Sequence, residues 1–413
     1  MVSEESRNYR IWCLVRDQIG HIKPVEAWFG NRAEFIYDTD HNPDYMLRKA
    51  PDIVLCVNDF PYDIMQCIDA AHKTNIPSLV LQDGILEWRC QYENPIFGFG
   101  GGAPQHQPVI ASKIACIGNQ SARQIAAWGN SHKVEVTGMP RMDYLRDFEV
   151  PPPTKPGKRL LVMTAKKPGF TPEQIQITLR SLQDVQRYLS SRADIEVVWR
   201  ITKSLHTQLG VENQLKDLAS QELAQILSRV DAVITTPSTA MLEAMLLRRP
   251  VAALDYHNVP RFVLTAWTIS APDHVEPVIN ELLSPPANKL DYQDFCLHDC
   301  LYLKFPAAQR VGELIIKMVA ASREIRTETG AFRLPSNLLG YGELPVGPPN
   351  LGTLYPNHEA FQENDLQALQ VRYARLQKEN EQLKQQIISR TFGYWLSVGA
   401  RYIAQRVRHR GAK

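Results

Sequence analysis

Hydroxyl groups are concentrated in a single stretch of the chain, "RVDAVITTPSTAMLEAMLLRRPVAALDY", with one acid in the helix that would follow them. Residues 231–234, apolar after Asp231 and β-branched at the end, predict a short buried strand. Thr236, Ser238 and Thr239 form a turn after that strand, and Ser238 or Thr239 is placed to cap a helix with Glu243 in its first turn. Such a turn can bind an anion, most often a phosphate, although a plain capping turn would have the same sequence.

Cations follow two other predicted strands of the same half of the chain. Arg200 lies near the end of "IEVVWRIT", and Lys166 and Lys167 follow "RLLVMTA". All three could meet the same anion if the strand ends converge. Lysines after a strand are also typical of a solvated loop.

Length, charge and cysteine usage limit the class of protein. A chain of 413 residues should hold two domains and an additional segment, and a net charge of +2 argues against nucleic acid as the main partner. The seven cysteines lie mostly in apolar, strand-like runs, which predicts reduced core thiols. Without a signal-peptide pattern or a run of 18 apolar residues, we expect a cytoplasmic protein.

Two segments of alternating strands and helices flank a proline-rich seam at 149–158, "EVPPPTKPGK". This alternation predicts an α/β protein with two Rossmann-like, parallel-sheet domains, at 8–148 and 159–325. Ligands would bind in the cleft between the domains, outside the carboxyl ends of the strands. We expect the helix near 306–323 to close the second domain.

The last part of the chain has three different patterns. Prolines and glycines at 326–365 predict a flexible linker. A heptad pattern at 366–388 predicts a coiled coil that forms a homodimer, although a lone solvated helix would share the pattern. Residues 389–413 hold six Arg/Lys and no acid. This composition predicts an amphipathic helix that lies on an anionic membrane surface, although such a helix could also pack on the protein itself. The candidate membrane-surface residues are Phe392, Trp395, Leu396, Arg401, Tyr402 and Arg406.

The order of these patterns resembles a known family. The stretch quoted first, the loop "PSLVLQDGILEW" and the segment "KIACIGNQSARQIAAWGNSHKVEVTGMPRMDYL" are similar to glycosyltransferases of the GT-B type. They are especially similar to the bacterial surface-polysaccharide and CDP-glycerol glycerophosphotransferase-like group. Two departures bear on catalysis: Gln82-Asp83-Gly84 stands where many relatives have His before Gly, and no His-Pro follows Arg200.

The resemblance implies a role for most of the candidate residues. The acceptor domain would be 8–148, with Gly84 and Arg141 at the acceptor or the domain interface. Independently of the resemblance, Asp83 is the candidate catalytic base, because it follows a buried strand of this domain and partial burial can raise the pKa of a carboxyl group into a useful range. The donor domain would be 159–325, where Glu243 contacts sugar or ribose hydroxyls. The donor-binding residues would be Lys166, Lys167, Arg200, Thr236, Ser238, Thr239 and Glu243. Local roles remain open for two acids, because Glu243 would also favour its helix dipole and Asp83 could simply form a turn before glycine.

The expected function is transfer of a sugar-type group from a nucleotide-activated donor to a lipid-linked surface-polysaccharide acceptor. The protein would be peripheral to the inner face of the cell membrane. No cofactor and no metal are expected, since "CLHDC" at 296–300 lacks a second ligand cluster. A nucleotide-sugar epimerase of the same fold and a non-catalytic scaffold for polysaccharide assembly are the alternatives.

Overall fold

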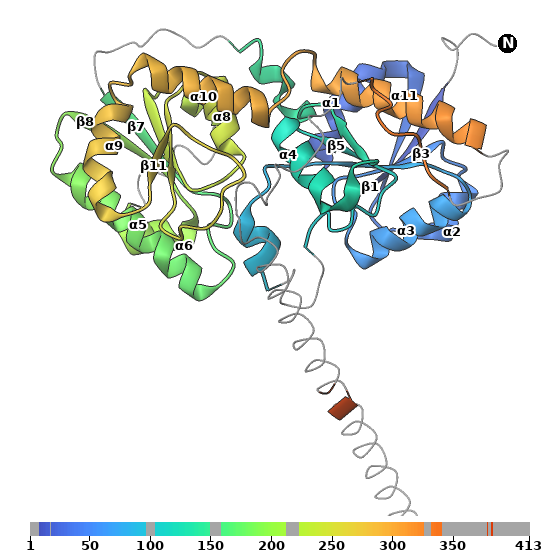
Figure 1. The fold of residues 1–413 in the computed structure, drawn as a ribbon, viewed down its shortest axis with the longest axis horizontal. Coiled ribbons are helices and arrows are strands. Elements are labelled where there is room, and N and C mark those ends of the chain that lie inside the picture. The colour runs from blue at the N-terminus through green and yellow to red at the C-terminus, as the bar shows by residue number, and fades with distance from the viewer. Residues whose placement is uncertain are drawn as a thin grey trace, which may run out of the picture. The chain divides into compact units, whose positions relative to one another are not determined.

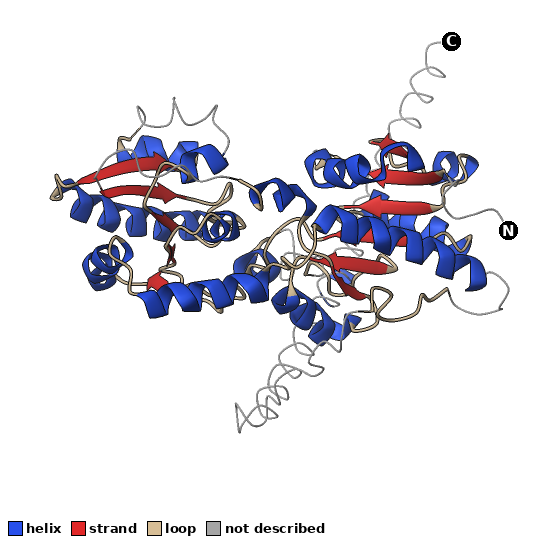
Figure 2. Cartoon of the chain, turned by 90° about the horizontal axis from the view of Figure 1, so that it is seen from above, coloured by secondary structure: helices blue, strands red, loops and turns tan. Residues whose placement is uncertain are grey.

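The computed structural model describes residues 8–16, 18–95, 104–148, 158–211, 223–325, 332–340, 378 and 381–382. Two compact units divide the chain, Met1–Val346 and Gly347–Lys413. The first unit contains two α/β domains, each a parallel sheet between helices (Figures 1 and 2).

The first domain has six parallel strands in the order β2-β1-β3-β4-β5-β6. Apolar residues such as those of "IVLC" in β3 are buried on both faces because helices cover both sides of the sheet. Its strands are β1 (Tyr9–Leu14), β2 (Ala33–Asp38), β3 (Ile53–Cys56), β4 (Ser78–Leu81), β5 (Lys113–Cys116) and β6 (Val134–Val136). Its helices and helical turns are α1 (Ile19–Phe29), η2 (Gly30–Arg32), α2 (Pro43–Arg48), α3 (Tyr62–Lys73), η3 (Arg89–Glu93), α4 (Asn119–Ile125), η5 (Ala126–Asn130) and η6 (Pro140–Leu145).

The second domain has five parallel strands in the order β11-β10-β9-β7-β8. Its strands are β7 (Lys158–Met163), β8 (Ile195–Arg200), β9 (Ala232–Thr235), β10 (Val251–Leu254) and β11 (Trp267–Ile269). Its helices are α5 (Pro172–Ser190), α6 (Lys203–Leu209), α7 (Leu223–Leu227), α8 (Ala240–Leu246), η8 (Pro272–His274), α9 (Val275–Leu282) and α10 (Ala287–Cys300). The predicted fold class, two parallel-sheet α/β domains, is therefore confirmed.

Each sheet has a point where the strand order reverses. In the first sheet β1 pairs with both β2 and β3, and in the second β7 pairs with both β8 and β9. Loops that leave two adjacent strands in opposite directions open a crevice at their carboxyl ends, which is where ligands bind in open α/β sheets. In the second domain the crevice follows the paired residues Met163 and Thr235.

We expected from the sequence that this helix closes the second domain, and that prediction is wrong, because α11 (Ala307–Ile325) packs on the first domain. Its buried face, which includes Val311 and Ile315, belongs to the apolar core that contains Val25 of α1 (Figure 1). Asp143 of η6 accepts hydrogen bonds from the first two backbone N–H groups of α11, each at 2.8 Å. The periodicity of the sequence predicted an apolar stripe, but it does not say which sheet the stripe covers.

Residues 332–340 also pack on the first domain, so the prediction of a flexible linker across 326–365 is wrong for this segment. Leu334 and Leu339 are buried in the same apolar core as α11. The carboxylate of Glu135, itself buried beside Lys113, accepts hydrogen bonds from the N–H groups of Leu338 and Leu339 at 2.8 and 3.2 Å. The local sequence, rich in proline and glycine, did not indicate an ordered segment, because the residue that binds it lies about 200 positions earlier in the same chain.

The remaining predictions concern the cysteines, the seam at 149–158 and the last part of the chain. All seven cysteines are free, and all but Cys90 are buried, as expected. Of the seam 149–158, the structure describes only Lys158, where β7 begins. Of the coiled coil 366–388 it describes Lys378, Glu381 and Gln382, which are helical and exposed. The segment 389–413 lies outside the described residues. Among the helices that are described, none is both long and apolar enough to cross a membrane.

Candidate active site

Three threonines join the loops that follow β7, β8 and β9. The hydroxyls of Thr164 and Thr202 lie 3.0 Å apart, and the hydroxyl of Thr236 accepts a hydrogen bond from the N–H of Ala165 at 2.8 Å. Thr236 is almost fully buried. These bonds hold the loops at the crevice between β7 and β9, and Thr236 therefore positions the neighbouring turn and loop.

The 236–239 turn meets the first domain directly. The N–H of Ile85 donates to Thr239 Oγ1 at 3.2 Å, and a Cβ atom on Gly84 would lie only 2.5 Å from the same oxygen. Thr239 is the N-cap of α8, but its side chain makes no capping hydrogen bond. Ser238 Oγ is buried and has no hydrogen-bond partner among the described residues.

The side-chain capping that we expected of Ser238 or Thr239 is therefore absent from α8. Thr239 serves the contact between the domains instead, because Gly84 has no side chain to keep the two loops apart. Ser238 keeps a hydroxyl without a protein partner among the described residues, beside the domain contact. Burying such a group without a partner costs about 1–3 kcal/mol, so a ligand that bonds to it would recover this energy.

Glu243 is buried and forms an ion pair across the domains. Arg141 of η6 donates through Nη1 to Glu243 Oε1 at 2.8 Å. The pair joins the only acid in the first turn of α8 to the first domain. Arg141 thus lies at the domain interface, one of the two locations that the resemblance implied, and one carboxylate oxygen of Glu243 is engaged by protein.

Asp83 follows β4, in the loop whose Ile85 contacts Thr239. The Gln82 side chain shapes its loop, because it donates to the carbonyl of Gly84 at 2.7 Å and accepts from the N–H of Ile117 at 3.1 Å. Gln82 is buried, whereas Asp83 is exposed. The sequence suggested a partly buried Asp83, but buried Gln82 occupies the inner position of the loop.

His21 is a candidate site residue that sequence reasoning missed. It lies in the first turn of α1, after the carboxyl end of β1. Its half-buried imidazole is close enough to Arg141 and Asp83 for both charges to affect its pKa. Burial lowers the pKa of His21, the positive charge of Arg141 lowers it further, and Asp83 opposes the shift. A neutral imidazole at pH 7 can accept a proton. Nothing in the local sequence "DQIGHIKPV" signals this role, which depends on two distant segments.

The predicted cations lie on the second-domain side. Lys166 and Lys167 are exposed in the loop that Thr236 holds, and Arg200 is half-buried at the end of β8. Burial raises the pKa of the Cys90 thiol to about 11, with Glu87 and Asp83 adding to the shift and Lys167 opposing it. Lys167 and Asp83 therefore lie within electrostatic range of one side chain, from opposite domains.

Among the comparisons with known proteins, the one with solved structures agrees with this architecture. No protein-family profile and no curated protein sequence matches the chain. Among solved structures, S. aureus MnaA with UDP is 14% identical, with a TM-score of 0.52, over 78% of this chain and 99% of that one. A variant of the wall teichoic acid polymerase TagF with CDPG is 13% identical, with a TM-score of 0.50, over 78% and 91%. A putative UDP-N-acetylglucosamine 2-epimerase from Listeria monocytogenes is 12% identical, with a TM-score of 0.50, over 80% and 99%.

The fold is GT-B. At these identities the likeness concerns the fold alone, and the chemistry must be argued from the residues in the cleft. In this GT-B chain the two domains meet through the 84–89 segment and Arg141 on one side, with His21 near Arg141, and through the loops after β7, β9 and β10 on the other.

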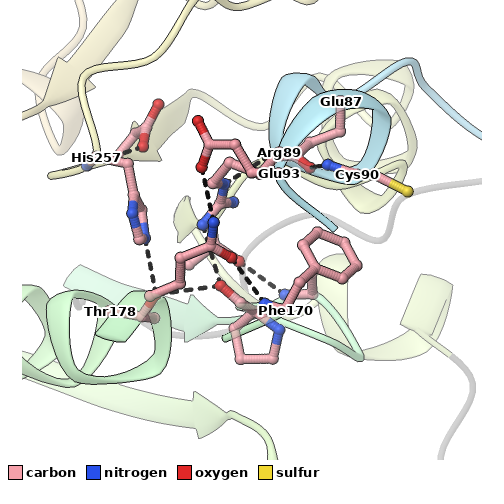
Figure 3. Close-up of polar contacts among 12 residues, drawn as sticks. Glu87, Arg89, Cys90, Glu93, Phe170, Thr178 and His257 are labelled. Carbon is pink, nitrogen blue, oxygen red and sulfur yellow. Dashed lines mark hydrogen bonds and ion pairs between the residues drawn. The ribbon is translucent and has the colours of Figure 1, made fainter. Parts of the chain in front are cut away.

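A second polar junction joins the two domains at η3 (Figure 3). Arg89 of η3 is almost fully buried, and its guanidinium donates to Glu87 Oε1 at 2.6 Å and to the carbonyl of Pro168 at 3.1 Å. His257 Nε2 lies 3.3 Å from the hydroxyl of Thr178, and burial together with Arg89 lowers the pKa of His257 to about 4. A first-domain arginine is thereby enclosed by second-domain loops.

Among the residues that the structure describes, no cluster of three His, Cys, Asp or Glu side chains could hold a metal ion. Within "CLHDC", Cys296 and Cys300 are buried, whereas His298 is exposed and bonds to its own helix. Helical spacing turns the histidine away from the two thiols.

Proposed function

We propose that this protein is a glycosyltransferase, or a closely related glycerophosphotransferase-like enzyme, that uses a nucleotide-activated donor. The observation that carries the proposal is the contact between the 236–239 turn and the Gly84–Ile85 backbone. It brings a serine hydroxyl that has no partner among the described residues, an inter-domain acid–arginine pair and the Asp83 loop to one interface. Transfer chemistry needs a donor site and an acceptor site that face each other in this way.

The donor diphosphate would bind at the second-domain wall. Ser238 would donate a hydrogen bond to it, and Arg200, Lys166 and Lys167 would offset its negative charge. Thr236 and Thr239 would act mainly by holding the turn, since their hydroxyls already accept protein hydrogen bonds. Glu243, kept in place by Arg141, would have one carboxylate oxygen for a sugar or ribose hydroxyl. The proposed transfer uses these side chains and requires no cofactor or metal.

The acceptor hydroxyl would approach from the first-domain wall. Asp83 is the proposed base. Neutral His21, whose pKa is affected by the charge of Asp83, would assist by accepting the proton or by orienting the carboxylate. Gly84 leaves space for the close approach of the two walls.

The proposed acceptor is a lipid-linked glycan at the inner face of the cell membrane. Support comes from the acid-free sequence of 389–413, in which basic and aromatic residues are combined. A homodimer through 366–388 would present two such tails. The named solved structures include a wall teichoic acid polymerase, which fits a role in surface-polymer synthesis.

The test is binding followed by turnover. The full-length chain is titrated calorimetrically with UDP, GDP, CDP and CMP compounds, and the best binder is then supplied as its sugar or glycerol conjugate with lipid extract. Transfer of label into the lipid fraction is expected. If no nucleotide binds at millimolar concentration, the chain is not a transferase of this kind, and a scaffold role gains support.

A nucleotide-sugar epimerase is the second candidate, favoured by the likeness to a putative UDP-N-acetylglucosamine 2-epimerase across 99% of that chain. The two activities differ in product, because epimerisation converts the donor without any acceptor. Proton NMR of UDP-N-acetylglucosamine incubated with the enzyme alone separates them. Appearance of an epimer would replace the transferase proposal.

A further inference from the structure

The exposed face of α10 carries aromatic and acidic side chains together. Phe295 is 69% exposed and Tyr292 is 44% exposed, and their rings stack with centroids 6.4 Å apart. Asp291 and Asp294 are exposed beside them, because residues three and four apart lie on one face of a helix. The buried face of the same helix contributes Leu297 to the core of the second domain. Stacked apolar rings with polar neighbours, left open to solvent, are typical of an interaction surface.

The sequence around this face is strongly acidic. Residues 270–300 contain six Asp/Glu and a single lysine, Lys289. The ammonium group of Lys289 already donates to Glu281 Oε2 at 2.7 Å. Asp291, by contrast, has no ion-pair partner among the described residues. A partner that covers the aromatic pair must therefore bring positive charge to its acidic neighbours.

One segment of this chain has the complementary composition. Residues 389–413 contain six Arg/Lys and no acid, together with four aromatic residues in their first half, Phe392, Tyr394, Trp395 and Tyr402. We propose that the exposed face of α10 binds the segment 389–413 of a second copy of the chain. This assigns a partner to a surface that the transfer reaction does not use, so the inference does not rest on the proposed activity.

The chemistry of the face favours this occupant over others. An arginine side chain can lie over the rings of Tyr292 and Phe295 and reach the carboxylates beside them. Anionic lipid and nucleic acid would be repelled by Asp291 and Asp294. The basic partner is directed to the Asp291 end, because the other end of α10 borders a hollow of about 420 Å³ that Arg146 and other residues line.

The predicted coiled coil at 366–388 would supply the second copy at a high local concentration. In such a pair each chain gives one segment and receives one, so the assembly closes without leaving a face uncovered. An anionic membrane would compete with α10 for the same basic side chains. The proposed contact would therefore hold the segment when the protein is away from the membrane.

The test is photo-cross-linking of the full-length protein without lipid. Phe295 is replaced by p-benzoylphenylalanine, an aromatic residue that bonds to neighbouring C–H groups when it is irradiated. Denaturing electrophoresis shows whether the link joins two copies, and mass spectrometry identifies the linked peptide. The control carries the same residue in place of Tyr62, which is 72% exposed on the first domain. We expect the residue at position 295 to link two copies through 389–413, and the control to form no such link.

Charge is tested in the same assay, at a protein concentration that gives half of the maximal link. Asp291→Asn combined with Asp294→Asn should lower the yield about threefold, as for the loss of two partly exposed ion pairs. The matched control combines Asp44→Asn with Asp69→Asn, two exposed acids of the first domain, and should leave the yield unchanged.

The remaining outcomes would all overturn the proposal. The absence of a link to 389–413, or a link that stays within one copy, removes the proposed partner. A link from position 295 to α10 of the second copy would mean that the face covers itself in a symmetric contact. An unchanged yield after neutralisation of both acids would contradict the charge complementarity on which the choice of segment depends.

Discussion

His21 shows how the surroundings of one side chain can prepare it for proton transfer. Its pKa is lowered chiefly by burial and then by Arg141, so the imidazole is neutral at pH 7. The nearby negative charge of Asp83 favours the imidazolium that would form when a proton arrives. The two residues therefore suit a shared role at the acceptor.

Replacing His21 by Gln should lower kcat by about 100-fold with little change in KM, because general-base assistance acts in the transition state. The wild-type rate should fall as the pH drops through the lowered pKa of His21, since only the neutral imidazole accepts a proton. This acidic limb should disappear in the variant. His298→Gln, at an exposed position of α10, is the control. An unchanged pH profile in His21→Gln would assign His21 a structural role.

Ser238 and Thr239 should contribute differently to nucleotide binding. Ser238→Ala removes a buried hydroxyl that has no protein partner among the described residues, so it should weaken nucleotide binding by about 1–2 kcal/mol while raising the melting temperature of the ligand-free protein. Replacing both Ser238 and Thr239 by Ala should cost about 2–4 kcal/mol. Ser204→Ala, exposed on α6, should be neutral. Unchanged calorimetric affinity in the double variant would remove the donor from this turn.

At the scale of elements, the contact between the loop after β4 and the turn after β9 depends on Gly84, because a glycine has no side chain. A Cβ atom on Gly84 would lie 2.5 Å from Thr239 Oγ1. Gly84→Ala should therefore push the two loops apart and weaken nucleotide affinity and turnover together. Adding Thr239→Ala should restore part of the stability, because the clashing oxygen is gone. Gly20→Ala is the matched control, since no atom lies within 4 Å of its added Cβ. A fully active Gly84→Ala would show that the contact is dispensable.

The junction of η3 with the second domain should loosen in acid. Because the folded-state pKa of His257 is about 4, against 6.5 for the free side chain, the unfolded chain takes up the proton first as the pH falls. Stability should therefore be lost progressively from about pH 6.5 to about pH 4, by at most about 1.4 kcal/mol per pH unit.

Thermal unfolding of wild type and His257→Gln across this pH range measures the effect. Glutamine can still hydrogen-bond to Thr178 but does not titrate, so the variant should show a shallower loss of stability. His72, whose pKa is also lowered to about 4, contributes equally to both proteins. Parallel curves would mean that His257 is not the titrating group.

At the scale of the whole molecule, the tail should govern where the enzyme works. The aromatic face of 389–413 would enter lipid headgroups, and each basic residue would add about 1 kcal/mol on an anionic surface. A chain truncated before Glu363 should stay folded and bind nucleotide, because residues Met1–Val346 form a compact unit. It should, however, no longer sediment with anionic vesicles. If the full-length protein ignores such vesicles at low salt, the lipid-linked acceptor loses its main support.

Local pattern was enough to predict most of the strands and the two-domain fold. Runs such as "DIVLCV" and "AVITT" are apolar because both faces of a parallel strand are buried. Burial on both faces requires consecutive apolar residues, which can be recognised in the local sequence. The 236–239 turn was predictable for the same reason, since a strand, a hydroxyl-rich turn and a helix follow one another directly. The short edge strand β11 was missed because three residues carry too little periodicity.

Only the tertiary structure decided what the site residues contact. His21, Asp83, Arg141 and Glu243 come from four separate segments, and their meeting depends on how two sheets face each other. The hydroxyl of Thr239 bonds to Ile85 across the cleft, although its local sequence favoured a helix cap. Likewise, α11 carries an apolar stripe that could cover either sheet, and contacts with Asp143 and α1 place it on the first. The amino-acid sequence determines such long-range pairings only through the packing of the whole fold, so local patterns do not contain them.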